Sequence, residues 1–250
     1  MKLDDFFYGI ENQKAFSYIK DGNGEFIPVK NPEYNLYFGT IYPFTIFGEE
    51  LNNINEYCYE ISKLILEKYN DALNDLTVYR DLDENQLPYS LYNDDVTYYE
   101  ILIGYEHSLY MWENILWQGA YHLIVLLYAF LERTIQAICD LFPQKNDFTA
   151  KKVKRPKLYH YLEQIFNMDV QRILGESSNS YRIIEEARQF RNQFVHGTFR
   201  KTNDKDIFTF DEIKEYPTFR IIDLINVIVY ILDLSEEQYI NLPRNKKHEQ

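Results

Sequence analysis

Beyond about residue 50, apolar residues recur at steps of three and four positions, which is typical of amphipathic helices. The first such stripe starts near Leu51 and contains Ile54, Cys58, Ile61, Leu64, Ile65 and Tyr69. Further helices are predicted at about 96–142, 156–168, 180–196 and 219–234. Pro143 ends the first of these further helices, within which Gly104 and Gly119 are candidate interruptions. The pattern predicts a mainly α fold, with five or six helices bundled around one core.

The first 50 residues lack this periodicity. Gly22-Asn23-Gly24 is a turn signal, and the prolines at 28, 32 and 43 interrupt any helix. Residues 34–47 are rich in Tyr, Phe, Ile and Thr, which favours short strands or an extended arm. We therefore predict an N-terminal aromatic, partly extended arm at 1–50, a helical-bundle domain at 51–242 and a polar tail at 243–250.

Composition narrows the class of protein. Hydrophobic residues fill 46% of the 250 positions, so the chain can bury a core and is not a disordered protein. The longest apolar run, 123–131, is much shorter than the ~20 residues of a membrane span, so no membrane partner is expected. Two cysteines cannot form a disulfide framework, and Cys58 and Cys139 fall at apolar helical positions that favour core packing. A soluble cytoplasmic protein is expected.

Charge is distributed unevenly along the chain. The net formal charge of −13 argues against a protein that binds nucleic acids without specificity. Residues 145–201 nevertheless hold 12 basic and 6 acidic residues. The basic side chains gather most densely at Lys151, Lys152, Lys154, Arg155 and Lys157. This segment is either a solvated loop or a local phosphate-binding patch that guides RNA.

Most motifs that carry chemistry are absent from the sequence. Gly22-Asn23-Gly24 lacks the third glycine and the following helix of a phosphate-binding loop. The acidic run that starts at Asp81 has Gln86 where a calcium loop requires glycine. No paired-cysteine or His-Glu-x-x-His zinc signature occurs. We therefore expect neither a metal ion nor a cofactor.

The segment 188–197 is different, because it places three kinds of polar group on one helix. At about 100° per residue, this helix has an apolar arc that contains Ile183, Ile184, Ala187, Phe190, Phe194 and Val195. Arg191 falls inside the arc, where a guanidinium needs an ion pair, a pocket or an interface. Arg188, Asn192 and His196 follow at four-residue steps along one edge. Such a set can neutralise a phosphate, hold it and move a proton.

Arg191-Asn192-x-x-x-His196 resembles the Arg-x4–6-His motif of the HEPN superfamily, in the form in which a polar residue follows the arginine. The resemblance covers about residues 51–240 and implies a helical bundle. It also implies a metal-independent endoribonuclease of the toxin–antitoxin or anti-phage defence type, which dimerises so that two motifs meet in one site. On this resemblance Arg191 and His196 are catalytic and Asn192 assists them. Arg188 supports the site from the same helix, and Glu132 is the polar residue on an earlier helix that faces it.

Helical geometry adds a constraint to this site. Five residues of straight helix place Arg191 and His196 about 140° apart. The two side chains converge only if the helix loosens before Gly197, or if each works with a second subunit, and we therefore expect a homodimeric site. A second match to the motif spacing, from Arg155 to His160, has proline after the arginine and lacks the asparagine, so we treat it as a chance match.

Three other interpretations stay open. In the first, Arg191 pairs with a buried carboxylate such as Glu132 while His196 caps the helix end, and both roles are structural. In the second, the bundle binds a nucleotide, RNA or a protein partner through the same pocket without turnover. In the third, the chain is a structural or antitoxin subunit whose apolar helices and aromatic arm bind a partner chain.

Overall fold

The computed structural model describes residues 16–20, 26–30, 37–82, 98–143, 156–175, 179–196 and 217–242. These residues are mainly α-helical, which confirms the prediction of a mainly α fold. The elements in chain order are β1 (Phe16–Lys20), β2 (Phe26–Lys30), α2 (Phe44–Asp81), α3 (Tyr98–Leu141), α4 (Lys157–Phe166), α5 (Val170–Leu174), α6 (Asn179–His196) and α7 (Ile221–Ile240). The predicted polar tail at 243–250 lies outside the described residues.

Within the first 50 residues, the structure describes one antiparallel pair of strands. The register of β1 and β2 sets Phe16 opposite Lys30, and Lys20 opposite Phe26. Pro28 lies inside β2, opposite Tyr18. Each strand of a two-stranded sheet has one edge without a partner strand, and such an edge accommodates a proline.

α2 begins at Phe44, earlier than the predicted start at Leu51, and continues to Asp81. Pro43 occupies the N-cap position. Phe44, Gly48 and Leu51 are all buried, at steps of four and three residues, so the buried stripe of α2 already includes its first turn. Two of the aromatic residues that favoured an extended arm, Phe44 and Phe47, therefore lie in a helix, because tertiary contacts override local preference.

α3 is one uninterrupted helix, so the predicted interruptions at Gly104 and Gly119 are wrong. Gly119 lies where α2 and α3 approach each other closely, since a Cβ there would come within 2.7 Å of Ile65 Cδ1. Gly104 faces open space, with nothing within 4 Å of an added Cβ. A single glycine costs a helix interior only about 1 kcal/mol, which the packing of a long helix outweighs.

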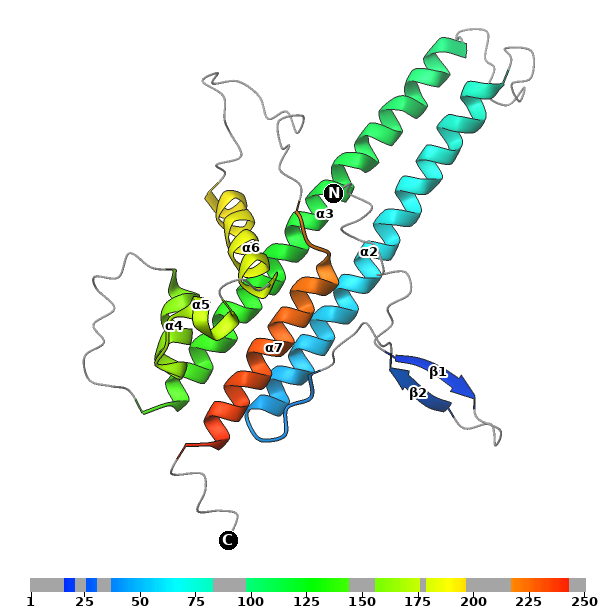
Figure 1. Ribbon diagram of the computed structural model, residues 1–250. Coiled ribbons are helices and arrows are strands. Elements are labelled where there is room, and N and C mark those ends of the chain that lie inside the picture. The colour runs from blue at the N-terminus through cyan, green and yellow to red at the C-terminus, as the bar shows by residue number, and fades with distance from the viewer. Residues whose placement is uncertain are drawn as a thin grey trace.

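α2 and α3 form a long antiparallel pair on which the other helices pack (Figure 1). α7 lies beside both helices over part of their length, α6 crosses α3, α4 covers the C-terminal part of α3, and α5 packs against α4 and α6. The C-terminal end of α2 and the N-terminal end of α3 project beyond α7 (Figure 1). α3 is therefore the helix that joins α2, α4, α6 and α7 into one bundle.

The core is built mainly from α3 and α7. Its fully buried apolar side chains on these two helices include Leu123, Ile124, Leu127, Leu131, Ile135, Ile138, Ile221, Leu224, Ile228 and Leu232. By length and composition α3 could cross a membrane, but 56% of its most apolar window is buried within the protein. The expectations of no membrane partner and a cytoplasmic location stay predictions.

Both cysteines pack in the core, as the sequence pattern predicts. Burial raises the pKa of Cys58 to about 12 and the pKa of Cys139 to about 11. A thiol that is protonated at neutral pH is a poor nucleophile. Neither cysteine is therefore a candidate for covalent catalysis.

A strap at residues 37–43 passes over Gly48 of α2 and is fixed to α7 by Glu236. The Glu236 carboxylate accepts hydrogen bonds from Tyr37 Oη at 2.8 Å, Thr40 N at 2.5 Å, Thr40 Oγ1 at 2.8 Å and Ile41 N at 3.0 Å. Burial alone would raise the pKa of Glu236, but these hydrogen bonds outweigh burial and lower it. A buried carboxylate thus ties the entrance of α2 to the last helix.

A substitution at Gly48 tests whether the strap lies as close to α2 as the structure shows. A Cβ at this position would lie 2.7 Å from Tyr37 O and 2.9 Å from Phe38 O. Because backbone atoms cannot rotate away, we expect Gly48→Ala to lower the free energy of unfolding by about 1 to 3 kcal/mol. Gly104→Ala is the matched control, and it should raise that free energy by about 0.5 to 1 kcal/mol. Urea denaturation measures both, and equal effects would contradict the close approach.

Glu236 tests the anchor itself. Glu236→Ala removes the acceptor of four hydrogen bonds, one of them buried and three partly buried, so we expect the free energy of unfolding to fall by about 3 kcal/mol. Glu237→Ala changes an exposed neighbour and should alter it by less than about 0.5 kcal/mol. Thermal and urea unfolding of the two variants and the wild type provide the comparison. Equal free energies of unfolding for the two variants would contradict a stabilising role of Glu236.

Candidate active site

A pocket of about 530 Å³ opens between α3, the start of α4, and α6. It is lined by Tyr128, Glu132, Pro156, Lys157, Arg188, Arg191 and Asn192. Positions three or four apart lie on the same side of a helix, which explains how α3 contributes 128 and 132 and how α6 contributes 188, 191 and 192. The pocket therefore brings together five residues that the sequence singled out: Glu132, Lys157, Arg188, Arg191 and Asn192.

Arg191 is paired but still reachable from the pocket. Its Nη1 donates a hydrogen bond to Asn192 Oδ1 at 3.0 Å, and its Nη2 lies 3.7 Å from Glu132 Oε2. That second distance is too long for a hydrogen bond, so it describes an ion pair without direct contact. The side chains of Arg191 and Glu132 are 30% and 21% exposed. Arg191 thus has the ion pair that its place in an apolar arc requires, and solvent reaches both partners.

Arg188 is held much more firmly, by Glu185 one turn earlier on α6. Arg188 Nε donates to Glu185 Oε2 at 2.9 Å, and Arg188 Nη2 donates to Glu185 Oε1. Tyr159 Oη and Gln189 Nε2 also donate to this carboxylate. Burial would raise the pKa of Glu185, but these donors outweigh burial and lower it to about 2. The hydrogen bonds with Glu185 in turn raise the pKa of Arg188. Arg188 is therefore a lining residue of the pocket whose position is fixed and whose side chain stays positively charged.

Tyr128 is a lining residue that did not stand out in the sequence. It lies one helical turn before Glu132 on α3 and is only 2% exposed. Burial, and next the Glu132 carboxylate, raise the pKa of Tyr128 well above its ordinary value. The available signal was its four-residue spacing from Glu132, but such a tyrosine in an apolar helix is not distinguishable from a core residue without the packing.

The proton-transfer candidate, His196, is the last residue of α6. Its backbone is helical, and the prediction about its side chain lies outside what the structure describes. α6 stays helical from Arg191 to His196, so the helix does not loosen between these two residues. Their Cα positions therefore remain about 140° apart around the helix axis.

The predicted basic segment is described only at its end. Lys151, Lys152, Lys154 and Arg155 lie outside the described residues. Lys157 is the first residue of α4, is exposed, and lines the pocket. His160 of the chance match lies on the same helix, where burial lowers its pKa against the opposing effect of Glu163.

The predicted apolar arc of α6 is buried over most of its length but not at its end. Ile183, Ile184, Ala187 and Phe190 are buried. Phe194 and Val195 are 43% and 53% exposed, so the apolar arc is not buried at the last turn of α6. The last turn of α6, within the motif, thus presents two apolar side chains to solvent.

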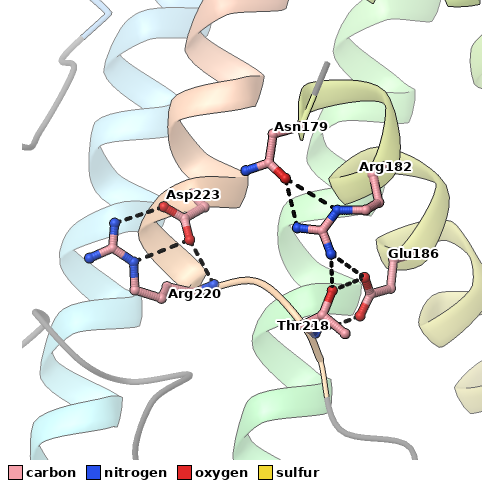
Figure 2. Close-up of polar contacts among 6 residues, drawn as sticks. All are labelled: Asn179, Arg182, Glu186, Thr218, Arg220 and Asp223. Carbon is pink, nitrogen blue, oxygen red and sulfur yellow. Dashed lines mark hydrogen bonds and ion pairs between the residues drawn. The ribbon is translucent and has the colours of Figure 1, made fainter. Parts of the chain in front are cut away.

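A polar cluster fixes the other end of α6 to the start of α7. Figure 2 shows Glu186 of α6 accepting hydrogen bonds from Thr218 N and Thr218 Oγ1, both at 2.6 Å. Arg182 donates to Thr218 Oγ1 and to Asn179 Oδ1 in the same cluster (Figure 2). Beyond Thr218, the Asp223 carboxylate in the first turn of α7 accepts hydrogen bonds from the backbone N and the guanidinium of Arg220. These contacts hold the motif helix against the core at its N-terminal half.

Comparisons with protein-family models, with curated proteins and with solved structures found no match. Among the residues that the structure describes, no three His, Cys, Asp or Glu side chains are grouped so that they could hold a metal ion. The resemblance of Arg191, Asn192 and His196 to the HEPN motif therefore remains an interpretation of these residues.

The Glu185 anchor predicts a particular dependence of stability on pH. Its folded-state pKa of about 2 lies below its ordinary value of 4.5, so its stabilising contribution is complete above about pH 4.5 and is lost as the pH falls toward 2. We expect Glu185→Gln to lower the free energy of unfolding by about 1.5 to 3 kcal/mol at pH 7. The gap to wild type should shrink steadily between pH 5 and pH 3 in urea titrations.

The exposed Glu237→Gln variant is the control for this series, and its gap to wild type should stay small at every pH. A Glu185→Gln gap that is the same at pH 7 and at pH 3 would show that the carboxylate charge is not what stabilises this part of α6.

Proposed function

We propose that the chain is a metal-independent endoribonuclease of the HEPN type. The observation that carries the proposal is the pocket in which Arg188, Arg191 and Asn192 of α6 face Glu132 of α3. Two guanidinium groups and an amide in one concave site suit a phosphate, which takes charge-assisted hydrogen bonds from such donors. The biological role that goes with this activity is a toxin or anti-phage effector, controlled by an antitoxin or another regulatory partner.

The proposed reaction is an internal transfer at phosphorus. The RNA 2′-hydroxyl loses its proton and attacks the adjacent phosphorus, and the bond to the 5′-oxygen breaks. The 5′-oxygen takes up a proton, so the products are a 2′,3′-cyclic phosphate and a 5′-hydroxyl. Arg191 neutralises the charge that develops on the phosphorane, Asn192 orients the phosphate or the imidazole, and His196 moves the proton.

A homodimer fits this reaction better than a single chain. Arg191 and His196 are about 140° apart on a helix that stays regular between them. Phe194 and Val195 offer an exposed apolar surface on the same turn as His196. An isologous contact between two α6 helices would cover this surface and would let Arg191 of one chain work with His196 of the other.

Charge supports an RNA substrate at this end of the molecule. Residues 145–201 are rich in Lys and Arg, whereas the rest of the chain is strongly acidic. Lys157 stands at the edge of the pocket, directly after the basic segment 151–155. A local basic surface on an acidic protein attracts phosphate near the site and limits binding elsewhere. The RNA is thus expected to enter along this segment.

A second candidate function is a non-catalytic bundle that binds a nucleotide, RNA or a protein partner through the same pocket. The observation in its favour is that both arginines already have carboxylate partners, Glu185 for Arg188 and Glu132 for Arg191. A pocket with paired cations can bind an anion without having the free charge that catalysis requires. The third interpretation, a structural or antitoxin subunit, would show itself by co-purification with a fixed partner chain.

An RNA-cleavage assay in the presence of EDTA separates these functions. Purified wild type should cleave a pool of tRNA and mRNA and leave 2′,3′-cyclic phosphate ends. We expect His196→Ala and Arg191→Ala to lose at least about 100-fold in rate, the usual contribution of a general acid–base group or a preorganised charge. His160→Ala is the matched control, because it removes the histidine of the chance match, and it should cleave like wild type.

Circular dichroism spectra of all four proteins confirm that each is folded. Activity that requires a divalent cation would contradict the mechanism. Equal cleavage by wild type and His196→Ala would contradict the site. RNA binding by a folded wild type without any product would favour the non-catalytic bundle.

A further inference from the structure

Tyr128 is a buried tyrosine in the wall of the pocket, and its hydroxyl has no role in holding the described helices together. The residue is 2% exposed and lies in the wall of the pocket. Within the described part of the chain, its hydroxyl makes no hydrogen bond, although buried tyrosine hydroxyls nearly always have a partner. Tyr128 lines the pocket, so a ligand bound there lies next to this side chain.

The groups around this hydroxyl define what it can bind. Arg188 and Arg191 are donors only, and the Oδ1 of Asn192 is occupied by Arg191, which leaves its amide NH2 to donate. Glu132 is the acceptor among these lining side chains; it forms an ion pair with Arg191, and its charge also acts on Tyr128. A pocket with several donors and one engaged acceptor fits a ligand that is rich in acceptors, such as the oxygens of a phosphate.

The net charge of the side chains at the pocket indicates which class of phosphate fits. Lys157, Arg188 and Arg191 are positive, and Glu132 and Glu185 are negative, so these five groups together carry one positive charge. A phosphodiester carries one negative charge, whereas a terminal phosphate carries nearly two at neutral pH. The net positive charge of these five groups therefore matches the single negative charge of one phosphodiester.

We propose that the Tyr128 hydroxyl is a substrate-binding donor, which hydrogen-bonds a non-bridging oxygen of a phosphodiester held between Arg191 and Asn192. The proposal rests on the proposed function of this pocket and adds to it a binding residue and the class of phosphate. Because burial raises the pKa of Tyr128, the phenol stays protonated and can donate at every pH at which the protein would work. A neutral donor also adds no charge to a site that is already balanced.

Tyr128→Phe tests this role by removing one oxygen atom. The hydroxyl makes no hydrogen bond within the described protein, so we expect the melting temperature to stay equal to that of wild type or to rise. Binding of a 2′-O-methyl RNA oligonucleotide, which cannot be cleaved, should weaken about tenfold or more, as for a lost hydrogen bond to a charged group. Tyr59→Phe is the control, because Tyr59 is a buried tyrosine of α2 that does not line the pocket, and it should bind like wild type.

The phosphate class is tested with two small ligands. Uridine 2′,3′-cyclic monophosphate carries one charge and uridine 3′-monophosphate carries nearly two. We expect wild type to bind the cyclic diester more tightly, and Tyr128→Phe to weaken its binding. Tighter binding of the monoester would overturn the claim of a phosphodiester site.

The outcomes separate this proposal from the proposed ribonuclease activity. Equal oligonucleotide binding by wild type and Tyr128→Phe overturns the role of Tyr128, even if wild type cleaves RNA. A lower melting temperature together with weaker binding also overturns it, because the hydroxyl would then be structural. Weaker binding by a stable variant supports it, even if wild type cleaves no RNA and the nuclease proposal fails. Absence of binding of the oligonucleotide and both nucleotides to folded wild type overturns both.

Discussion

The packing of α3 against four other helices is the constraint on which the rest of the structure depends. Because α3 meets α2, α6 and α7 on different sides, its C-terminal half is buried around most of its circumference. Such a helix has few places for polar side chains, and each of them needs a partner or a pocket. Tyr128 and Glu132 occupy one of these places, where α3 faces α6. The pocket is thus a consequence of how the central helix is packed.

The two arginines of the pocket are restrained to very different degrees. Arg188 is bound by a carboxylate that Tyr159 and Gln189 also hold, so both its position and its charge are fixed. Arg191 has a 3.7 Å ion pair and one hydrogen bond to its neighbour Asn192. A fixed cation beside one that can exchange partners suits a site in which a phosphate replaces a carboxylate. In the proposed reaction, Arg188 would supply a fixed positive charge near the phosphate, and Arg191 would stabilise the negative charge that develops on the phosphorane.

The sequence predicts the helices and the motif better than the contacts between them. Periodicity is a local property, so the bundle class and the buried face of α6 from Ile183 to Phe190 follow from it. The Glu236 anchor and the Glu186–Thr218 contact join residues far apart in the chain, and no local pattern announces them. Phe194 and Val195 fit the apolar arc but are exposed, because an arc does not reveal where its covering element ends. The sequence does not single out Tyr128, because a tyrosine in an apolar helix looks like an ordinary core residue. Only the three-dimensional contacts show that it lines the pocket and that its hydroxyl lacks a partner among the described residues.

The unequal lengths of the helices divide the bundle into two regions of different cooperativity. At about 1.5 Å per residue, α7 spans about 30 Å, whereas α2 spans about 57 Å and α3 about 66 Å. No residue of α3 before Leu116 is buried, and beyond Leu66 only Ala72 and Leu76 of α2 are. Amides in this two-helix extension should exchange with solvent through local opening, while those around Leu123 and Leu131 exchange only when the whole bundle unfolds. The end of the molecule that holds the pocket is therefore also the end that stays folded longest.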